Sequence, residues 1–542
     1  MTTTTASSLK IPARWPRGAA LAERVALVAV AAFLVYLAVR LRAVIGASYA
    51  NGDNASALVL AQFLGERGHE GVVLGDYRWL EPLYALHLTR WLPAHRQAWE
   101  VAPFALYALT VAMAWWTVRR AVSGGAALGV ALAMAAPSPI VLGFVGVPNA
   151  HAHTLTHSVL LSVFLVTAPG LAARGRPARA AWALALAVTL AAGATSDPLL
   201  LVGPVPAFLV ACAVGERLKL LRRDVALLGG VACCAGVAAG LGLAAYATHA
   251  GIVSSGNPLA LATAEQLAPH TRLLLESLAL YGHGRIGGPV TVLTAVLELA
   301  GLVVMIGVPL LLLRGRTPAL AFVTAADRPP AARLLLVFCA VVVAGVGGAF
   351  IASASPLDIY ATRYTLALWP ALLTLWAILA PPATARLALA ALASVAAVLG
   401  CVQLARGDYT TPTSEFPQGA EVGALERFAA AQHVDHGYAG YWESATITAQ
   451  TDFGLRLYPV IMCGAHSDGR CPPTVHRLDA WYTPQRRPMR TLYVVDEVAL
   501  GVGTVVQAPP VRWGAPVAQA TFGHLHAWVY DYDLARRLPE GS

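Results

Sequence analysis

Apolar runs of membrane-spanning length recur along this chain, as in residues 225–248 and 333–354. A helix needs about 20 apolar residues to cross a bilayer, and lipid restricts a spanning segment to a helix or a strand of a closed barrel. Of the 542 residues, 57% are hydrophobic and 12% are charged, whereas an average soluble domain carries about 25% charged residues. The sequence therefore predicts a polytopic α-helical membrane protein and argues against an array of soluble domains.

We predict about 11 transmembrane helices. The first covers residues 25–45 and follows a basic segment, 1–24, that we place in the cytoplasm. A signal-peptidase site after Ser48-Tyr49-Ala50 is an alternative, but the spans that follow favour an uncleaved first helix. The other ten spans are predicted at 101–118, 124–146, 153–169, 180–195, 198–214, 225–248, 289–313, 333–354, 364–380 and 385–404.

Basic residues predict the orientation of these helices. The net charge of +9 comes largely from Lys and Arg beside the apolar runs, so it indicates membrane topology and no nucleic-acid partner. The connections near 147–152 and 195–198 carry no Lys or Arg, and we place them outside. The N-terminus then lies in the cytoplasm, and residues 405–542 lie outside. The composition, rich in Ala and Arg, is typical of a GC-rich bacterial genome, so the predicted location is the plasma (inner) membrane.

Residues 405–542 differ in character from the rest of the chain. Charged residues, Pro and aromatic residues become more frequent there, and alternating runs at 490–498 and 526–534 predict strands. We expect a small extracytoplasmic α/β domain. Cys463 and Cys471 lie eight positions apart around a turn, which favours a disulfide over free thiols in an oxidising compartment. The other five cysteines lie in apolar runs, where a thiol usually packs.

Polar residues gather at helix ends on the predicted outer side, above all in the segment 46–100 that follows the first helix. Ionisable groups at a membrane boundary are costly and often mark function. The simpler alternative is that each residue anchors or caps a helix. The set comprises Asp53, Glu81, residues 148–153, residues 196–198, His283, Arg285, Asp358, Tyr360 and Arg363.

The acids of this set allow two interpretations. Asp53 opens an apolar run and fits a helix N-cap, but a carboxylate at the membrane surface can also act as a general base. Glu81 and Asp197 each precede a proline, which suits a helix cap with Pro in the first turn.

The basic residues of the set also allow two interpretations. His153 and His157 are one helical turn apart, and with His151 or an acid they would suit a divalent metal, although no third ligand is evident. Arg363 is either an interfacial anchor or a bidentate clamp for a phosphate.

The order of these features resembles the GT-C class of membrane glycosyltransferases, which includes protein O-mannosyltransferases and bacterial aminoarabinose transferases. The resemblance rests on the outer loop beginning with Asp53, the element Pro82-Leu83-Tyr84, the late helix start Arg363-Tyr364 with Pro370, and the extracytoplasmic end of the chain. It implies transfer of a hexose or pentose from a polyprenyl-phosphate donor on the outer face. The acceptor would be a glycan, lipid or protein, and the transferred sugar would become part of a cell-envelope glycan.

In that class an acid of the first outer loop deprotonates the acceptor hydroxyl, and cations or a metal stabilise the departing lipid phosphate. The resemblance implies Asp53 as the base. Many relatives carry a second acid directly after it, whereas this chain has Asn54. Either Asp53 works alone, or Asp76, Glu81 or Asp197 supplies the second acid. The candidates for binding the donor phosphate are Arg78, His283, Arg285 and Arg363, and a phosphate head needs such cations or helix N-termini in any case.

Two other functions fit the same pattern of helices. A transporter or flippase for lipid-linked sugars would need ionisable groups near helix midpoints or broken helices in corresponding halves. The predicted spans are mostly Ala, Leu and Val with acids at their outer ends, which favours chemistry at the membrane surface. A non-catalytic assembly protein is the third alternative. Convergence of Asp53, a second acid and Arg363 on one outer cavity would separate these functions.

Overall fold

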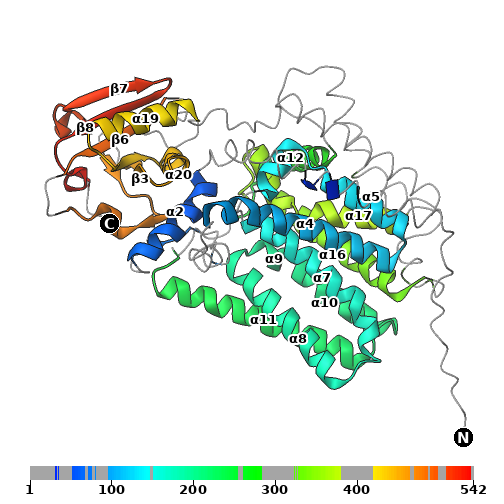
Figure 1. Ribbon diagram of the computed structural model, residues 1–542. Helices are drawn as coiled ribbons and strands as arrows, with labels where there is room; N and C mark the ends of the chain where they lie inside the picture. Colours follow the sequence, from blue (N-terminus) through cyan, green and yellow to red (C-terminus); the bar gives the residue numbers. More distant parts are fainter. Residues whose placement is uncertain are drawn as a thin grey trace, which may run out of the picture.

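The protein divides into a bundle of helices and a sheet unit, the latter at the left of Figure 1. The computed structural model describes residues 52–67, 71–75, 95–146, 150–253, 260–282, 328–379, 419–463, 469–485, 489–497 and 508–538, with a few single positions besides. Apart from such single positions, the predicted spans 25–45, 289–313 and 385–404 lie outside these residues.

Long apolar helices make up the bundle and run roughly side by side (Figure 1). Five stretches are long and apolar enough to cross a membrane. They are α7, α8, α11, α16 and the single stretch that α9 and α10 form together. They support a polytopic helical membrane protein, while the total of about 11 spans stays a prediction. The helices are α4 (His95–Ala121), α5 (Gly124–Ala135), α6 (Pro139–Val145), α7 (Ala150–Leu171), α8 (Arg176–Ser196), α9 (Leu199–Val202), α10 (Pro204–Arg217), α11 (Arg223–His249), α12 (Ala264–Tyr281), α16 (Pro330–Ala352), the 3₁₀ helix η2 (Ile359–Thr365) and α17 (Leu368–Leu379).

The prediction of one continuous span over 124–146 is wrong. Helix α5 ends at Ala135, and α6 begins at Pro139, which occupies its first turn. Pro137 and Pro139 lack the backbone N–H that a continuing helix requires, and their rings clash with the preceding turn. Proline can open a helix without that cost, so the chain stops and restarts here.

Helices α8 and α11 pack closely because small residues line their contact. A Cβ atom added at Gly236 would lie 2.4 Å from the carbonyl oxygen of Ala187, and one added at Gly240 would lie 2.6 Å from that of Ala191. Glycine therefore permits an approach that any other residue would block. Leu184, Val188, Leu227 and Val231, on the other sides of these helices, are exposed, as expected for surfaces that meet lipid.

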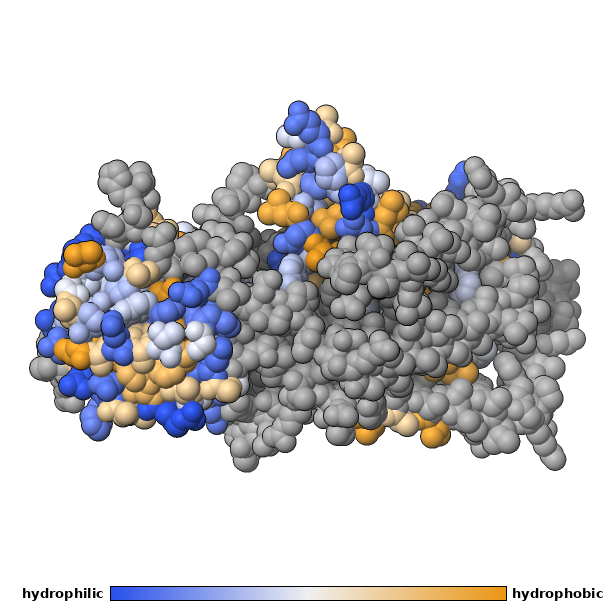
Figure 2. Space-filling model, turned by 90° about the horizontal axis from the view of Figure 1, so that it is seen from above, coloured by the Kyte–Doolittle hydropathy of each residue, from blue (hydrophilic) through white to orange (hydrophobic). Residues whose placement is uncertain are grey.

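The sheet unit holds six strands in the order β4-β3-β2-β6-β8-β7. Strand β2 pairs in parallel with β3 and β6, and the remaining pairs are antiparallel. The strands expected within 490–498 and 526–534 are observed as β6 and β8. Hydrophilic residues cover much of the face seen in Figure 2, where the unit lies at the left. Its elements are α19 (Ala420–Ala431), β2 (His436–Gly440), α20 (Tyr441–Gln450), β3 (Arg456–Cys463), β4 (Gly469–Cys471), β6 (Thr491–Asp496), η6 (Val511–Trp513), β7 (Ala518–Phe522), β8 (Leu525–Tyr530) and η7 (Leu534–Arg537).

A short segment near the start of the chain joins the two parts. Helix α2 (Gly52–Arg67) packs against α20, and the ring of Phe63 contacts Trp481 at 5.3 Å and Tyr458 at 6.1 Å between centroids. After α2, strand β1 (Val72–Val73) pairs with β5 (Arg477–Leu478), which the 3₁₀ helix η4 (Asp479–Tyr482) follows. The amide of Leu74 then donates to the carbonyl oxygen of Ile252, just beyond α11.

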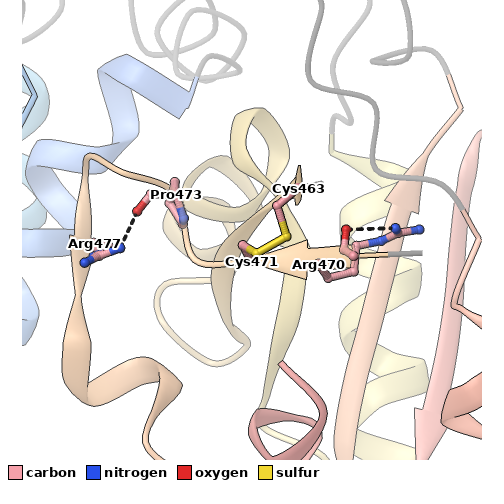
Figure 3. The surroundings of a disulfide bond; sticks show 6 residues. Cys463, Arg470, Cys471, Pro473 and Arg477 are labelled. Carbon is pink, nitrogen blue, oxygen red and sulfur yellow. Dashed lines mark hydrogen bonds between the residues drawn. A yellow bond between two sulfur atoms is a disulfide. The ribbon is translucent and has the colours of Figure 1, made fainter. Parts of the chain in front are cut away.

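Cys463 and Cys471 form a disulfide that joins the end of β3 to β4 (Figure 3). On the nearby strand β5, the guanidinium of Arg477 donates to the carbonyl oxygen of Pro473 at 2.9 Å. The compartment that oxidises the pair, and the boundaries predicted for an extracytoplasmic domain, stay predictions.

Candidate active site

A buried polar cluster lies where α7 begins and α8 ends. Asp197 is the C-cap of α8, and its Oδ2 atom lies 2.8 Å from Nδ1 of His151 in the first turn of α7. The hydroxyl of Thr154, one turn further along α7, also donates to Oδ2. The amide of Leu199 donates to Oδ1 at 3.0 Å. Both carboxylate oxygens are therefore occupied by donors.

The environment of Asp197 keeps its carboxylate ionised. The side chain is almost completely buried, and burial alone would raise its pKa. The neighbouring His151, the hydroxyl of Thr154 and the amide of Leu199 outweigh that effect and hold the pKa of Asp197 below its ordinary value. Hydrogen bonds to the charged form favour that form. Such an anion is a weak base, so this geometry suits a residue that orients its neighbours.

The 3₁₀ helix η2 brings Tyr364 and Arg363 to the same place. The rings of His151 and Tyr364 meet edge to face, with centroids 4.9 Å apart. The guanidinium of Arg363 donates to the Tyr364 hydroxyl at 3.3 Å, and its Cζ atom lies 5.2 Å from the Tyr364 ring centroid. Arg363, predicted as a phosphate clamp, thus lies next to the cluster around Asp197.

Helix α12 fixes the position of η2. The Tyr281 hydroxyl donates to the carbonyl oxygen of Thr362 at 3.2 Å and lies 2.8 Å from the hydroxyl of Thr365. Its ring stacks on Trp369 with centroids 5.6 Å apart and planes at 8°. Ser277, one turn earlier on α12, shares a hydrogen bond of 2.9 Å with the Thr362 hydroxyl. These buried contacts set where Arg363 and Tyr364 lie.

An apolar cavity of about 240 Å³ adjoins this cluster. Its walls come from α9, from the last turns of α16 and from the chain on either side of η2, including Leu199, Val346 and Phe350. Thr154 and Tyr364 also line it. Because Thr154 is bonded to Asp197 and Tyr364 to Arg363, the cavity is hydrophobic along most of its length and polar where these two residues lie.

The predicted histidine group does not converge on one point. His151 bonds to Asp197, whereas Nδ1 of His157 lies 2.6 Å from the carbonyl oxygen of His153. The side chain of His153 lines a small cavity next to Pro103 and Tyr107 of α4. Within the described ranges, no three His, Cys, Asp or Glu side chains gather as a metal site. The divalent metal therefore stays a prediction, and the described residues supply no set of ligands for it.

Asp53 lies in the first turn of α2, which begins at Gly52. The helix expected after Asp53 is present, and it starts two residues earlier than an N-cap at Asp53 would require. The other predicted site residues, Asp76, Arg78, Glu81, His283 and Arg285, lie outside the described residues.

Sequence reasoning did not single out Thr154 or Tyr281. Thr154 follows His151 by three positions on a helix, and residues with that spacing share a face. A polar residue there could have been assigned to the same site. Tyr281 lies on α12, which was not predicted, although its capping box of Thr263 and Gln266 is a recognisable start signal.

No protein-family model matches the chain, and no curated protein matches it. Two solved structures similar to it are those of ArnT from Cupriavidus metallidurans, one in the apo state and one bound to undecaprenyl phosphate. Each comparison gives a TM-score of 0.39 at 12% sequence identity and covers 91% of this chain and 97% of that chain. ArnT is an aminoarabinose transferase with the GT-C fold, the class that the sequence resembles.

Proposed function

We propose that this protein is an integral-membrane glycosyltransferase that moves a sugar from a polyprenyl-phosphate donor to an acceptor on the outer face of the membrane. The observation that carries the proposal is the apolar cavity of about 240 Å³ beside Asp197, His151, Tyr364 and Arg363. A cavity of this kind fits a ligand with a hydrocarbon part and an anionic head.

The two ends of the cavity match the two ends of such a donor. The apolar walls from α9 and α16 offer burial to an isoprenoid chain, at roughly 25 cal/mol for each Å² removed from water. The phosphate would lie toward Arg363, whose planar guanidinium can bind two phosphate oxygens at once. A cation near the membrane boundary, where water is partly excluded, also interacts with charge more strongly than one in bulk water.

The reaction is a single displacement at the anomeric carbon. The acceptor hydroxyl oxygen forms a bond to that carbon while the bond from the carbon to the phosphate oxygen breaks, and the electron pair leaves with the polyprenyl phosphate. The acceptor proton passes to a base, for which we propose Asp53. Arg363 would stabilise the charge that grows on the leaving phosphate, and such electrostatic stabilisation is often the largest contribution to catalysis.

Asp197 suits a positioning role better than that of the base. Its two oxygens already accept hydrogen bonds from His151, Thr154 and the Leu199 amide, and its lowered pKa opposes protonation. Through His151 it would fix the face of Tyr364 that borders the cavity. Glu81 and Asp76 remain the alternatives for a second acid.

The distribution of charge supports an outer-face reaction. The connection from α7 to α8 and the one from α10 to α11 carry arginines, and Arg179 and Arg222 pair with Asp224 there. The opposite end of α11 lies next to residues 71–75, which join the sheet unit. By the positive-inside rule, the arginine-rich end belongs in the cytoplasm. The sheet unit would then lie outside, where its disulfide suits an oxidising compartment.

Transfer in proteoliposomes tests the proposal. The donors are radiolabelled polyprenyl-phosphate mannose, glucose and arabinofuranose, and the acceptors are cell-wall glycan fragments. We expect label to move to the glycan. Asp53→Asn should lower the rate by about 10²–10⁴-fold, the usual contribution of a general base. Asp358→Asn is the control, because an Asn there can still cap η2, where Asp358 accepts from the Tyr360 amide.

One result would contradict the proposed enzyme, and another would contradict the role of its base. Movement of the intact lipid-linked sugar across the bilayer, without transfer, would identify a flippase. Transfer by Asp53→Asn at the wild-type rate would keep the enzyme and remove Asp53 as its base.

A further inference from the structure

A second cavity, of about 180 Å³, lies in the sheet unit and is separate from the cavity beside Asp197. It opens at the start of two neighbouring parallel strands, where His436 of β2 lies beside Arg456 of β3 in register. Asp435, Gln485, Asp533 and Trp481 also line it. Its volume corresponds to that of about six water molecules, which is enough for one sugar ring.

The walls carry charged and polar groups in fixed positions. The carboxylate of Asp435 lies 2.9 Å from Nδ1 of His436. Asp533 accepts the amide of Gln485 at 2.6 Å and that of Ala535 at 2.9 Å, which ties the segment containing Gln485 to the rest of the unit. Arg456 is held with its Cζ atom 5.3 Å from the ring centroid of Phe63 on α2. Gln485, Asp533 and Arg456 are therefore held in place before any ligand enters, whereas the Asp435 side chain is exposed.

Two buried nitrogen atoms on lining residues have no hydrogen-bond partner among the described residues. They are Nε2 of His436 and Nε1 of Trp481. Native proteins leave few buried polar atoms unsatisfied, because each one costs free energy. Because both atoms are themselves shielded from solvent, a ligand in the cavity would contact the accessible groups of the wall instead.

A packed aromatic cluster forms part of the lining of this polar site. Tyr458 and Trp481 stack with centroids 5.1 Å apart and planes at 12°, and Phe63 meets both rings edge to face. Tyr438, which also lines the cavity, donates its hydroxyl to the carbonyl oxygen of Trp481 at 2.8 Å. Packed aromatic rings of this kind offer an apolar body beside polar atoms.

We propose that this cavity binds one sugar unit of a saccharide. A sugar ring presents C–H groups on its faces and hydroxyls around its edge, which fits aromatic rings surrounded by carboxylates, an amide and a guanidinium. Two aspartates disfavour a free phosphate. A purely apolar ligand would displace water from these charged walls without replacing its hydrogen bonds.

The position of the cavity points to the acceptor glycan as the saccharide, an assignment that rests on the proposed function. Phe63 of α2 contacts the aromatic cluster, and Asp53 lies in the first turn of the same helix, ten residues earlier. That separation corresponds to about 15 Å along a helix axis. A short oligosaccharide can span this distance, with one sugar in the cavity and its growing end toward Asp53.

Binding of simple glycosides to the full-length protein in nanodiscs tests the site without any transfer. The probes are the methyl glycosides of mannose, glucose, galactose and arabinofuranose, detected by saturation-transfer difference NMR. We expect at least one to bind at millimolar concentration. Arg456→Gln and Asp435→Asn should each weaken that binding by about tenfold, as loss of a hydrogen bond to a charged group predicts.

Matched variants separate binding from folding. Arg427→Gln and Asp531→Asn change exposed residues that do not line the cavity, and they should bind as the wild type does. Thr483→Phe places a ring at an exposed lining position and should abolish binding without altering thermal unfolding. The proposal is overturned if no glycoside binds, if the cavity variants bind normally, or if glycylglycine competes for the site. Glycoside binding without sugar transfer in proteoliposomes would keep this site and refute the proposed enzyme.

Discussion

Nδ1 of His151 and Oδ2 of Asp197 lie 2.8 Å apart, although 46 positions separate the two residues. The contact forms because α7 begins and α8 ends on the same side of the bundle. Both side chains are almost fully buried. A buried ionised carboxylate is tolerated only when donors surround it, so this pair ties the geometry of the cavity to the packing of two helices.

Replacing Asp197 with Ala should destabilise the bundle strongly. The change removes the buried carboxylate that accepts from His151 and Thr154, and breaking a buried pair in this way costs about 3–5 kcal/mol. Asp197→Asn should cost less, because its amide oxygen can still accept. Thermal unfolding in detergent micelles measures both. Asp224→Ala is the control, since that carboxylate pairs with Arg179 near the surface, and an equal loss there would contradict the interpretation.

Tyr281→Phe should reduce sugar transfer more than it reduces stability. The variant keeps the stack on Trp369 and loses the hydroxyl bonded to Thr362 and Thr365, at a cost of about 1 kcal/mol. Because η2 carries Arg363, a small shift of this helix would misplace the phosphate clamp. Rates at saturating and limiting donor measure the effect. Tyr246→Phe, on an exposed face of α11, should behave as the wild type does.

Several features of this site could be predicted from the sequence. The apolar runs predicted α8 and α11 to within a few residues, and the absence of Lys and Arg near 147–152 and 195–198 placed the start of α7 and the end of α8 on one side. His151 and Asp197 were thereby expected on a common face.

Other features depend on contacts between distant segments. The sequence does not indicate which histidine bonds to Asp197, because His151, His153 and His157 all lie in one short stretch of α7. The rotation of α7 relative to α8 decides which of them meets Asp197. The break at Pro137 and Pro139 was missed because the surrounding run is apolar enough for a span. The docking of α2 on the sheet unit joins residues far apart in the sequence, which no local pattern encodes.

Phe63→Ala should loosen the contact between α2 and the sheet unit. The ring is buried against Trp481 and Tyr458, and deleting a buried aromatic ring costs about 3–5 kcal/mol. Hydrogen exchange should rise in residues 52–75 and in β5. Phe522→Ala removes a ring that packs on Phe428 elsewhere in the unit. It should raise hydrogen exchange near α19 and β7 only. A rise at α2 as well would mean that the Phe522 contact and the Phe63 contact do not stabilise separate parts of the structure.

Reduction of the disulfide between Cys463 and Cys471 should lower the unfolding temperature of the sheet unit. The bond closes a short loop, with a sequence separation of 8, and such a loop contributes about 2–3 kcal/mol. Thermal unfolding with and without a reducing agent measures the change. The variant with Ser at both positions should unfold at the reduced temperature in either buffer. Cys234→Ser, at an exposed thiol on α11, should leave the response to the reducing agent intact.

Glu443 makes the stability of the sheet unit depend on pH. The side chain is buried in the first turn of α20. Burial raises its pKa from 4.5 to about 8, with a further rise from Asp496 and opposing contributions from the backbone amides of Gly440, Glu443 and Asp496. Between these values the folded protein retains a proton that the unfolded chain has released. Stability must therefore fall as pH rises through this interval, by up to about 1.4 kcal/mol per unit, and this contribution levels off above the folded pKa.

Glu443→Gln should remove this dependence, because a glutamine keeps the shape of the protonated acid and cannot ionise. The variant and the wild type should differ least near pH 5, and the advantage of the variant should grow up to about pH 8. Thermal unfolding of both proteins across this range, followed by near-ultraviolet circular dichroism, gives the comparison. Glu426→Gln on α19 is the control for replacing a carboxyl group by an amide elsewhere in the unit. A constant offset for Glu443→Gln across this range would mean that Glu443 is already ionised in the folded protein at pH 5.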